Sequence, residues 1–410
     1  MVALWILAGC ARTPGGGDAT VDATVDSPDM ASESGSDVER VLPCDALVAM
    51  DDAGGDDVPP DGAPRAIALA ASTFNLCARM SDCTARCTGR TDWGGFLPPE
   101  PVTGLSGVAQ IARGGRHNCA VLVDGTVRCW GSNDRGQLGN GTVLWEDPDN
   151  PPRPVRDLSG AAEIALGGDH SCARIADGSV RCWGANDAGQ LGDGTTTMRT
   201  TPVRVVGLDG VVQISAGSAQ TCARLRDGSV RCWGRTYLPG DDAAMPMWLT
   251  PVVVSGLANA AQISAGAHHA CAVLTDSTVS CWGNGRLGVL GPTLSGNPNV
   301  VPLPGDAVQV AAGWEHTCAL LRDGIAYCWG SEEHGALGVC ESFTGGPQPI
   351  DHRALVRVPD IADFAEIATG VGLTCARRQR GGVYCWGYLA LIITPSGGAC
   401  RPVLIPGFGP

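Results

Sequence analysis

One pattern recurs along most of the chain: two cysteines separated by nine residues, with a turn sequence such as Asp-Gly between them. Residues 117–142, HNCAVLVDGTVRCWGSNDRGQLGNGT, form a clear copy. The seven pairs are Cys77/Cys87, Cys119/Cys129, Cys172/Cys182, Cys222/Cys232, Cys271/Cys281, Cys318/Cys328 and Cys375/Cys385. Successive pairs begin 42 to 57 residues apart, a period typical of propellers and solenoids. The 410 residues therefore predict one repeat architecture rather than two or three separate domains.

Two further landmarks accompany each pair. A strand-like triplet precedes it: Ala66-Ile67-Ala68, Gln110-Ile111-Ala112, Glu163-Ile164-Ala165, Gln213-Ile214-Ser215, Gln262-Ile263-Ser264, Gln309-Val310-Ala311 and Glu366-Ile367-Ala368. A second strand, usually Pro-Val, follows it: Pro101-Val102, Pro154-Val155, Pro202-Val203, Pro251-Val252, Val301-Pro302, Val356-Arg357 and Pro402-Val403. The alternation of hydrophobic residues around each pair, together with 58 Gly and 28 Pro, favours short strands and turns.

The order of these landmarks suggests a closed ring. No Pro-Val strand precedes the first cysteine pair, whereas one follows the last pair. We interpret this offset as ring closure, with residues 402–407 pairing into the blade that contains Cys77, because closure removes exposed strand edges. The sequence therefore predicts an all-β, seven-bladed β-propeller over residues 66–410, closed by the C-terminal strand.

The repeat also resembles a known family. Residues 167–195, GGDHSCARIADGSVRCWGANDAGQLGDGT, are similar to the repeat of the regulator-of-chromosome-condensation family, whose members are seven-bladed propellers. The resemblance covers residues 66–410. Unit one departs from it by lacking the Trp and by having Cys83 where most other units have the turn Gly, and units four to seven lose part or most of Gly-Gln-Leu-Gly. Family members include a nucleotide exchange factor that binds chromatin and a secreted bacterial inhibitor of β-lactamases, so the resemblance implies protein binding through a propeller face.

The paired cysteines are expected to form disulfides. A three-residue loop with a Gly bulge places Cys119 opposite Cys129, whereas a two-residue Asp-Gly turn explains the hydrophobic alternation better but staggers them, and the sequence leaves both registers open. Zinc ligation is the less favoured alternative, because one hairpin supplies only two of four ligands. The other cysteines suggest the pairs Cys44/Cys83 and Cys340/Cys400.

The N-terminus predicts export. Residues 1–9 form a short apolar signal segment, and Leu7-Ala8-Gly9-Cys10 resembles the lipobox of bacterial lipoproteins, which makes Cys10 a lipidation site. No Arg precedes this segment, so either translation starts upstream or the resemblance is fortuitous. Residues 10–65 are expected to be a disordered acidic spacer, because residues 11–65 carry 13 Asp and Glu against three Arg and few aromatic residues.

Composition excludes several functions. All 28 basic residues are arginine, so lysine-dependent chemistry such as a Gly-Lys-Ser phosphate loop or a Schiff base is ruled out. The net charge of −14 argues against nucleic-acid binding. No catalytic or calcium-binding motif emerges, so we expect neither an enzyme nor a cofactor or metal.

Two sets of repeated residues could carry function. His117, His170, His269 and His316 precede repeat cysteines and could form a ring of acid-base groups, but their single repeat position favours a structural hydrogen bond to the neighbouring turn. Six tryptophans are expected to pack between blades rather than to form a stacking platform: Trp130, Trp183, Trp233, Trp282, Trp329 and Trp386.

Irregular loops are the better candidates for binding. Residues 143–153 offer Trp145, and residues 235–249 offer Tyr237, Met245, Met247 and Trp248. We therefore predict a non-catalytic, monomeric, protein-binding propeller, lipid-anchored to the bacterial envelope at the outer membrane or cell surface, with an unidentified protein partner. The alternatives are an inhibitor or secreted enzyme that uses a propeller face, and a purely structural surface protein.

Overall fold

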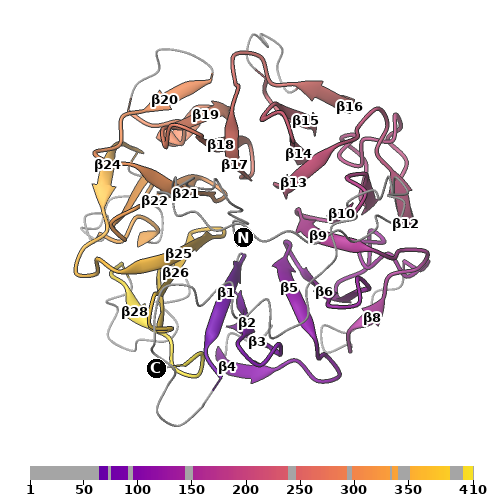
Figure 1. Ribbon diagram of the computed structural model, residues 1–410, viewed down its shortest axis with the longest axis horizontal. Coiled ribbons are helices and arrows are strands. Elements are labelled where there is room, and N and C mark those ends of the chain that lie inside the picture. Colours follow the sequence, from indigo (N-terminus) through magenta and orange to yellow (C-terminus); the bar gives the residue numbers. More distant parts are fainter. Residues whose placement is uncertain are drawn as a thin grey trace, which may run out of the picture.

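The computed structural model describes residues 64–72, 75–90, 96–143, 151–238, 246–292, 298–332, 335–339, 351–387 and 400–409. These residues form seven four-stranded antiparallel sheets, arranged as blades around a central axis (Figure 1). The predicted seven-bladed propeller is confirmed. The predictions for residues 1–63, including the signal segment, Cys10 and most of the spacer, lie outside the described residues.

Each blade consists of four strands that are consecutive in the chain. Blade 1 contains β1 (Ala66–Ala71), β2 (Asn75–Met80), β3 (Ala85–Arg90) and β4 (Phe96–Pro101); blade 2 contains β5 (Val108–Arg113), β6 (His117–Leu122), β7 (Val127–Gly131) and β8 (Arg153–Pro154); blade 3 contains β9 (Ala161–Leu166), β10 (His170–Ile175), β11 (Val180–Gly184) and β12 (Arg199–Arg204). Blade 4 contains β13 (Val211–Ala216), β14 (Gln220–Leu225), β15 (Val230–Gly234) and β16 (Trp248–Val253).

The remaining blades follow the same order, and the first strand of every blade lies nearest the axis (Figure 1). Blade 5 contains β17 (Ala260–Ala265), β18 (His269–Leu274), β19 (Val279–Gly283) and β20 (Asn299–Val301), with the 3₁₀ helix η1 (Arg286–Gly288) before β20; blade 6 contains β21 (Ala307–Ala312), β22 (His316–Leu321), β23 (Ala326–Ser331) and β24 (Asp351–Arg357); blade 7 contains β25 (Phe364–Thr369), β26 (Leu373–Arg378), β27 (Val383–Gly387) and β28 (Val403–Leu404).

The central hairpin of each blade carries the cysteine pair. Cys119 of β6 lies directly opposite Cys129 of β7, and Gly125 has a φ of 76° and donates its N–H to the Leu122 carbonyl. This is the three-residue loop with a glycine bulge, so the structure decides between the two registers. In blade 1, Cys83 takes a φ of 55° at the same turn position.

All seven predicted disulfides are present: Cys77–Cys87, Cys119–Cys129, Cys172–Cys182, Cys222–Cys232, Cys271–Cys281, Cys318–Cys328 and Cys375–Cys385. Cys83 and Cys400 are also disulfide-bonded. The expected partners of these two, Cys44 and Cys340, lie outside the described residues, so those pairings stay predictions. Seven disulfides, six of them fully buried, indicate folding in an oxidising compartment, such as the exterior of the cell.

The mode of ring closure differs from our expectation. The C-terminal strand β28 pairs with β27 in blade 7, not with the blade that contains Cys77, because every Pro-Val strand is the fourth strand of its own blade. The C-terminal segment nevertheless contacts blade 1, since the Ala66 N–H donates to the Phe408 carbonyl (2.7 Å). The strand triplet of blade 1 was also misplaced by two residues: Ala70, not Ala68, lies opposite Cys77.

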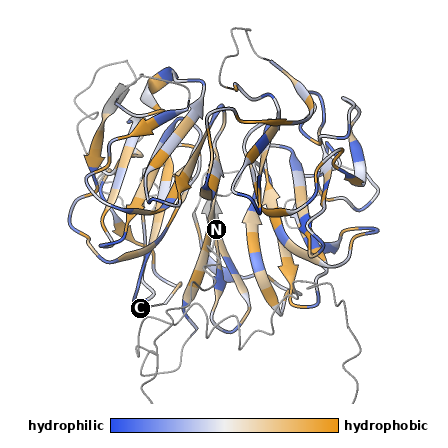
Figure 2. Ribbon diagram, turned by 45° about the horizontal axis from the view of Figure 1, so that its top comes forward, coloured by the Kyte–Doolittle hydropathy of each residue, from blue (hydrophilic) through white to orange (hydrophobic). Residues whose placement is uncertain are grey.

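The hydrophobic core lies between the blades. Seven clusters of buried residues each join two neighbouring blades; one contains Val121 and Leu138 of blade 2 with Trp183 of blade 3, and another joins Leu69 of blade 1 to Phe408 behind blade 7. The six repeat tryptophans are at most 8% exposed, so the predicted packing role is confirmed. Hydrophobic residues recur along the strands, whereas many turns are hydrophilic (Figure 2).

In six of the seven blades, a side chain on the first strand clamps the next blade. The amides of Gln110, Gln213, Gln262 and Gln309 accept from one backbone N–H of the following blade and donate to the C=O of the same residue, at 2.7–3.2 Å. Glu163 and Glu366 only accept such a bond, and each pairs with an arginine of its own blade, Arg174 or Arg377 (3.1 and 3.3 Å). Blade 1 has Ala68 here, so this clamp is missing between blades 1 and 2.

Within the described ranges, no helix is both long and hydrophobic enough to cross a bilayer.

Candidate functional site

The ring has two faces with different loops. The turn between the first and second strands of each blade and the loop after the third strand lie on one face, which we call the Trp314 face. The hairpin turns between the second and third strands and the connections between blades lie on the other, which we call the hairpin face.

The inner turns of the Trp314 face are bonded to one another. Backbone N–H groups donate to the inner turn of the next blade from Gly115 to Gly167 (3.1 Å), Gly168 to Gly217 (3.3 Å), Ala267 to Gly313 (3.2 Å) and Trp314 to Gly370 (3.1 Å). Between Gly217 and Gly266 the backbones approach so closely that a Cβ on Gly217 would overlap the Gly266 carbonyl oxygen. The inner rim of this face is therefore a rigid frame.

Trp314 projects from this frame and is 39% exposed. It occupies the position where the other described units have Gly115, Gly168, Ser218, Ala267 and Val371. Its ring contacts His268 of blade 5 edge-on, with centroids 6.2 Å apart and planes at 67°. Burial, and secondarily the charge of Arg235, lower the pKa of His268, which favours a neutral imidazole beside the indole.

Trp314 was not predicted from the sequence, although a signal was present. The tryptophans considered there belong to the Cys-Trp-Gly signature or to the irregular loops, whereas Trp314 lies in a regular turn. A tryptophan at a position that otherwise holds small residues indicates a side chain that the fold does not require.

The four repeat histidines are structural, as favoured, but their partner differs from the expected turn. Each Nε2 lies 2.8–2.9 Å from a hydroxyl of the next blade, on Ser171, Thr221, Thr317 or Thr374. That hydroxyl donates its one hydrogen to a loop carbonyl, so it must accept from a protonated Nε2. Burial lowers the pKa to about 3 for His117 and His269 and to about 4 for His170 and His316, so all four are neutral and inaccessible at neutral pH.

The loop residues expected to bind a partner fall into three groups. Trp145 and Met245 lie outside the described residues. Tyr237, half-buried, and Met247, 51% exposed, lie at the end of blade 4 that belongs to the Trp314 face. Trp248 is the first residue of β16, is half-buried, and packs against the clusters on both sides of blade 4. Its role in binding stays a prediction, and the packing shows that its side chain also contributes to the core.

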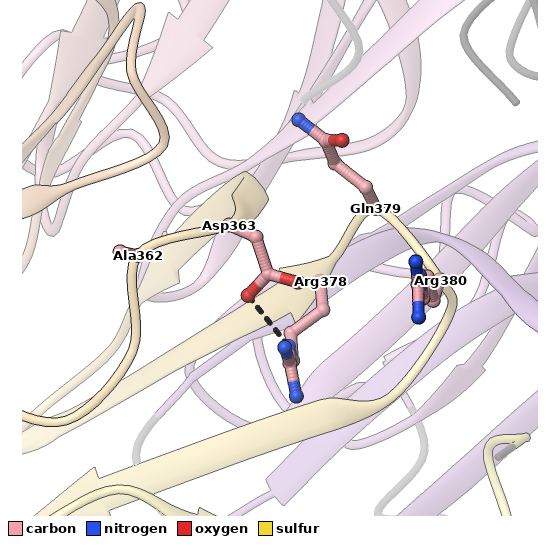
Figure 3. Close-up of a pocket in the computed structure, with 5 residues that line it drawn as sticks. All are labelled: Ala362, Asp363, Arg378, Gln379 and Arg380. Carbon is pink, nitrogen blue, oxygen red and sulfur yellow. Dashed lines mark hydrogen bonds and ion pairs between the residues drawn. The ribbon is translucent and has the colours of Figure 1, made fainter.

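The hairpin face is dominated by carboxylates. Six hairpin turns have an aspartate whose Oδ1 accepts from the backbone N–H two residues later: Asp82, Asp124, Asp177, Asp227, Asp276 and Asp323. In blade 7 the equivalent residue is Arg380. An open pocket of about 470 Å³ lies beside this turn, lined by Ala362, Asp363, Arg378, Gln379 and Arg380 (Figure 3).

The polar side chains of the described residues are engaged mainly with the scaffold. It contains no group of three or more His, Cys, Asp or Glu side chains placed to hold a metal ion. The buried histidines bond to Ser and Thr hydroxyls of the scaffold, and the aspartates of the hairpin turns bond to their own turns. The exposed features are instead an aromatic side chain on one face and charged turns on the other, which suit recognition of another macromolecule.

Comparison with known proteins places this geometry in a family. Residues 84–391 match the family described as the RCC1-like domain. The chain is 39% identical over 105 residues to the E3 ubiquitin-protein ligase HERC2 of Homo sapiens, covering 25% of this chain and 2% of the ligase. It is 35% identical over 114 residues to the ultraviolet-B receptor UVR8 of Arabidopsis thaliana, covering 27% of this chain and 25% of the receptor.

The structural comparison agrees with the family match. Yeast RCC1 (Prp20), solved bound to Kap60, superimposes with a TM-score of 0.68 at 19% identity, covering 94% of this chain and 91% of that one. Prp20p from Saccharomyces cerevisiae, described with its binding properties to Gsp1p and histones, gives a TM-score of 0.64 at 22% identity, covering 76% and 80%. At this identity the likeness shows the fold alone, but the family match covers most of the chain, and the protein therefore belongs to the RCC1-like domain family.

Proposed function

We propose that this protein is a non-catalytic binding propeller that holds a partner protein against its Trp314 face. The observation that carries the proposal is the exposure of Trp314 on a turn whose backbone is bonded to the next blade. An aromatic anchor that is already fixed loses little conformational entropy on binding, which is the usual property of interface hot spots.

Further exposed hydrophobic side chains support the same face. Of the nine large ones found exposed among the described residues, Leu97, Val143, Met198, Met247 and Trp314 lie at the strand ends and loops of the Trp314 face. Tyr237 and Trp248, the first residue of β16, lie at the same end of blade 4, whereas the predicted residues Trp145 and Met245 lie outside the described residues. Yeast RCC1, which has the same fold, was solved bound to the protein Kap60, which is consistent with a protein-binding role.

The proposal includes display outside the cytoplasm on a lipid anchor. The buried disulfides support an oxidising location, and the lipobox-like sequence supports lipidation of Cys10. Residues 10–65 would then act as the acidic spacer that lets the propeller reach its partner from the membrane.

The binding test compares Trp314→Ala with Val253→Ala. Val253 is 48% exposed at the hairpin-face end of β16, so its substitution removes an exposed hydrophobic side chain elsewhere. We expect a partner captured from cell envelopes to bind the purified Trp314→Ala protein at least 30-fold more weakly, which corresponds to about 2 kcal/mol. Val253→Ala should bind like the unmodified protein.

Equal binding by both variants would refute the role of the Trp314 face. Met247→Ala then tests the outer rim more cleanly than Trp248→Ala, because Trp248 packs into the core. The anchor is tested separately by mass spectrometry of the mature N-terminus, which should carry acyl chains on Cys10 and should lose them in Cys10→Ser.

A further inference from the structure

Two polar side chains of blade 2 depart from the repeat on the Trp314 face. Arg113 is the last residue of β5, where the other blades have Ala71, Leu166, Ala216, Ala265, Ala312 and Thr369. Asn118 lies opposite it on β6, where the other blades have Leu76, Ser171, Thr221, Ala270, Thr317 and Thr374. Six blades form the same strand pair without a cation, so the fold does not require the charge of Arg113.

The guanidinium of Arg113 is held between blades 1 and 2. Its Nη1 donates to Oδ1 of Asn118 (2.6 Å) and lies 3.6 Å from Sγ of Cys77, and its Nε donates to Oγ of Ser72 (3.3 Å). Ser72 and Cys77 belong to blade 1, and all three partners are neutral. The side chain is therefore fixed at the inner turns of the Trp314 face without an ion pair.

Two donor groups beside one another have no acceptor. Within the described part of the chain, nothing accepts a hydrogen bond from Nη2 of Arg113 or from Nδ2 of Asn118, although Asn118 is only 7% exposed. Neither atom is enclosed by the protein, so a ligand can reach both. Because Nδ2 shares a planar amide with the Oδ1 that bonds Nη1, one oxyanion can accept from both groups.

The charge of Arg113 is not compensated. Burial lowers its pKa to about 9, which leaves it cationic at neutral pH, and no acidic side chain of the described residues acts on it. By contrast, the arginines of the glutamate clamps, Arg174 and Arg377, each pair with a carboxylate. A partly buried charge without a counter-charge is costly, so an anion is attracted here. One positive charge beside a neutral amide matches a carboxylate better than a doubly charged phosphate.

We propose that Arg113 and Asn118 form a carboxylate-binding site on the Trp314 face, which receives an acidic side chain of the partner protein. The carboxylate accepts from Nη2 of Arg113 and Nδ2 of Asn118. The assignment to the partner rests on the proposed function, because the site lies on the same ring of inner turns as Trp314. The partner then presents a hydrophobic group to Trp314 and an acidic group to Arg113. A small free carboxylate is the other source of the same group.

The site itself is tested without any partner. Urea unfolding of the full chain with Cys10→Ser, the parent protein, is measured at neutral pH in about 0.1 M sodium acetate and in sodium chloride of equal ionic strength. Acetate should lower the unfolding equilibrium constant about three- to tenfold relative to chloride, which corresponds to a Kd of about 10–50 mM.

Three variants separate specific binding from a general salt effect. Arg113→Met keeps a long side chain without charge, and Asn118→Ser copies Ser171 of blade 3; both should lose most of the acetate effect. Arg116→Met removes an exposed arginine of the same turn and should keep it. Whatever remains in Arg113→Met measures the general action of acetate on stability.

Two results would overturn the site. One is an equal acetate effect in the parent and in Arg113→Met. The other is an effect that appears only in Asp92→Asn, because Asp92, which lies outside the described residues, would then already supply the carboxylate in the parent.

The source of the carboxylate is tested with the partner captured in the binding assay. Arg113→Met should bind it about tenfold more weakly than the parent, and Arg116→Met should bind it equally. Unchanged binding by Arg113→Met, together with the acetate effect in the parent, would overturn the assignment to the partner in favour of a small free carboxylate. Trp314→Ala should leave the acetate effect intact, so failure of the site is distinguishable from failure of the proposed function.

Discussion

The clamp formed by Gln262 provides a quantitative test of how neighbouring blades hold together. Its Oε1 accepts from the Val310 N–H (2.8 Å) and its Nε2 donates to the Val310 carbonyl (2.9 Å). Gln262 is 6% exposed and Val310 is 1% exposed, so water cannot replace the amide easily. Gln262→Leu keeps a similar volume and removes both hydrogen bonds.

The expected cost follows from the two backbone groups left behind. Each buried polar group without a partner costs about 1–3 kcal/mol, so Gln262→Leu should lower the free energy of unfolding by about 2–6 kcal/mol. Gln262→Glu keeps the bond from the Val310 N–H, but it buries a carboxylate opposite Val273, where no cation is present. Breaking the charge balance of a buried site in this way costs about 3–5 kcal/mol.

Blades 3 and 7 indicate how the second variant can be rescued. There the clamp is Glu163 or Glu366, and the residue opposite it is Arg174 or Arg377. The double variant Gln262→Glu/Val273→Arg should therefore be more stable than the sum of its single changes by about 1–3 kcal/mol.

The assay is urea unfolding followed by tryptophan fluorescence, with the disulfides intact. A loss below about 1 kcal/mol for Gln262→Leu would refute the clamp as a stabilising contact. A double variant no better than additive would show that the glutamate and arginine positions are not coupled.

Two further perturbations test the ring. Burial lowers the pKa values of the four repeat histidines to about 3 or 4: His117, His170, His269 and His316. Below pH 6.5 the unfolded chain therefore binds more protons than the folded protein, and the free energy of unfolding should decrease as the pH is lowered. Between pH 7.5 and pH 5.5 the free energy of unfolding should decrease by about 1.4 kcal/mol for each histidine. His170→Gln, which copies Gln220 of blade 4, should lessen this pH dependence in thermal melting. An unchanged pH dependence would contradict the assignment of a neutral, buried His170. Removing residues 402–410 deletes β28 and the fully buried Ile405 and Phe408, so the free energy of unfolding should decrease by more than about 5 kcal/mol. An unchanged melting temperature would show that the C-terminal segment does not close the ring.

Much of the fold could be predicted because each blade is encoded locally. The cysteines of a pair are ten residues apart, and the turn between them contains a Gly or an equivalent such as Cys83, so hairpin and disulfide follow from neighbouring residues. The assignment of the fourth strand could not be derived in this way. The sequence of a Pro-Val strand does not indicate whether the strand pairs with its own blade or with the next one. Only the observed pairing of β28 with β27 shows that it belongs to its own blade.

The candidate site was less accessible from the sequence. The irregular loops were predicted to bind a partner because they depart from the repeat, yet the structure places Trp248 in a strand, where its side chain packs into the core. Trp314 was passed over because its turn looks regular, and its exposure depends on how the turns of blades 5, 6 and 7 are bonded together.

The sequence by itself determined the number of blades, the disulfides and the packing role of the repeat tryptophans, because these follow from short-range patterns repeated seven times. The tertiary structure decided the contacts between blades: the closure at Ala66 and Phe408, the hydroxyl partners of the histidines, and the glutamine clamps. The histidine and glutamine contacts join residues about 50 positions apart, and the closure joins the two ends of the propeller. Repetition makes every blade an equally good partner in the sequence, so only the ring geometry selects which residues meet.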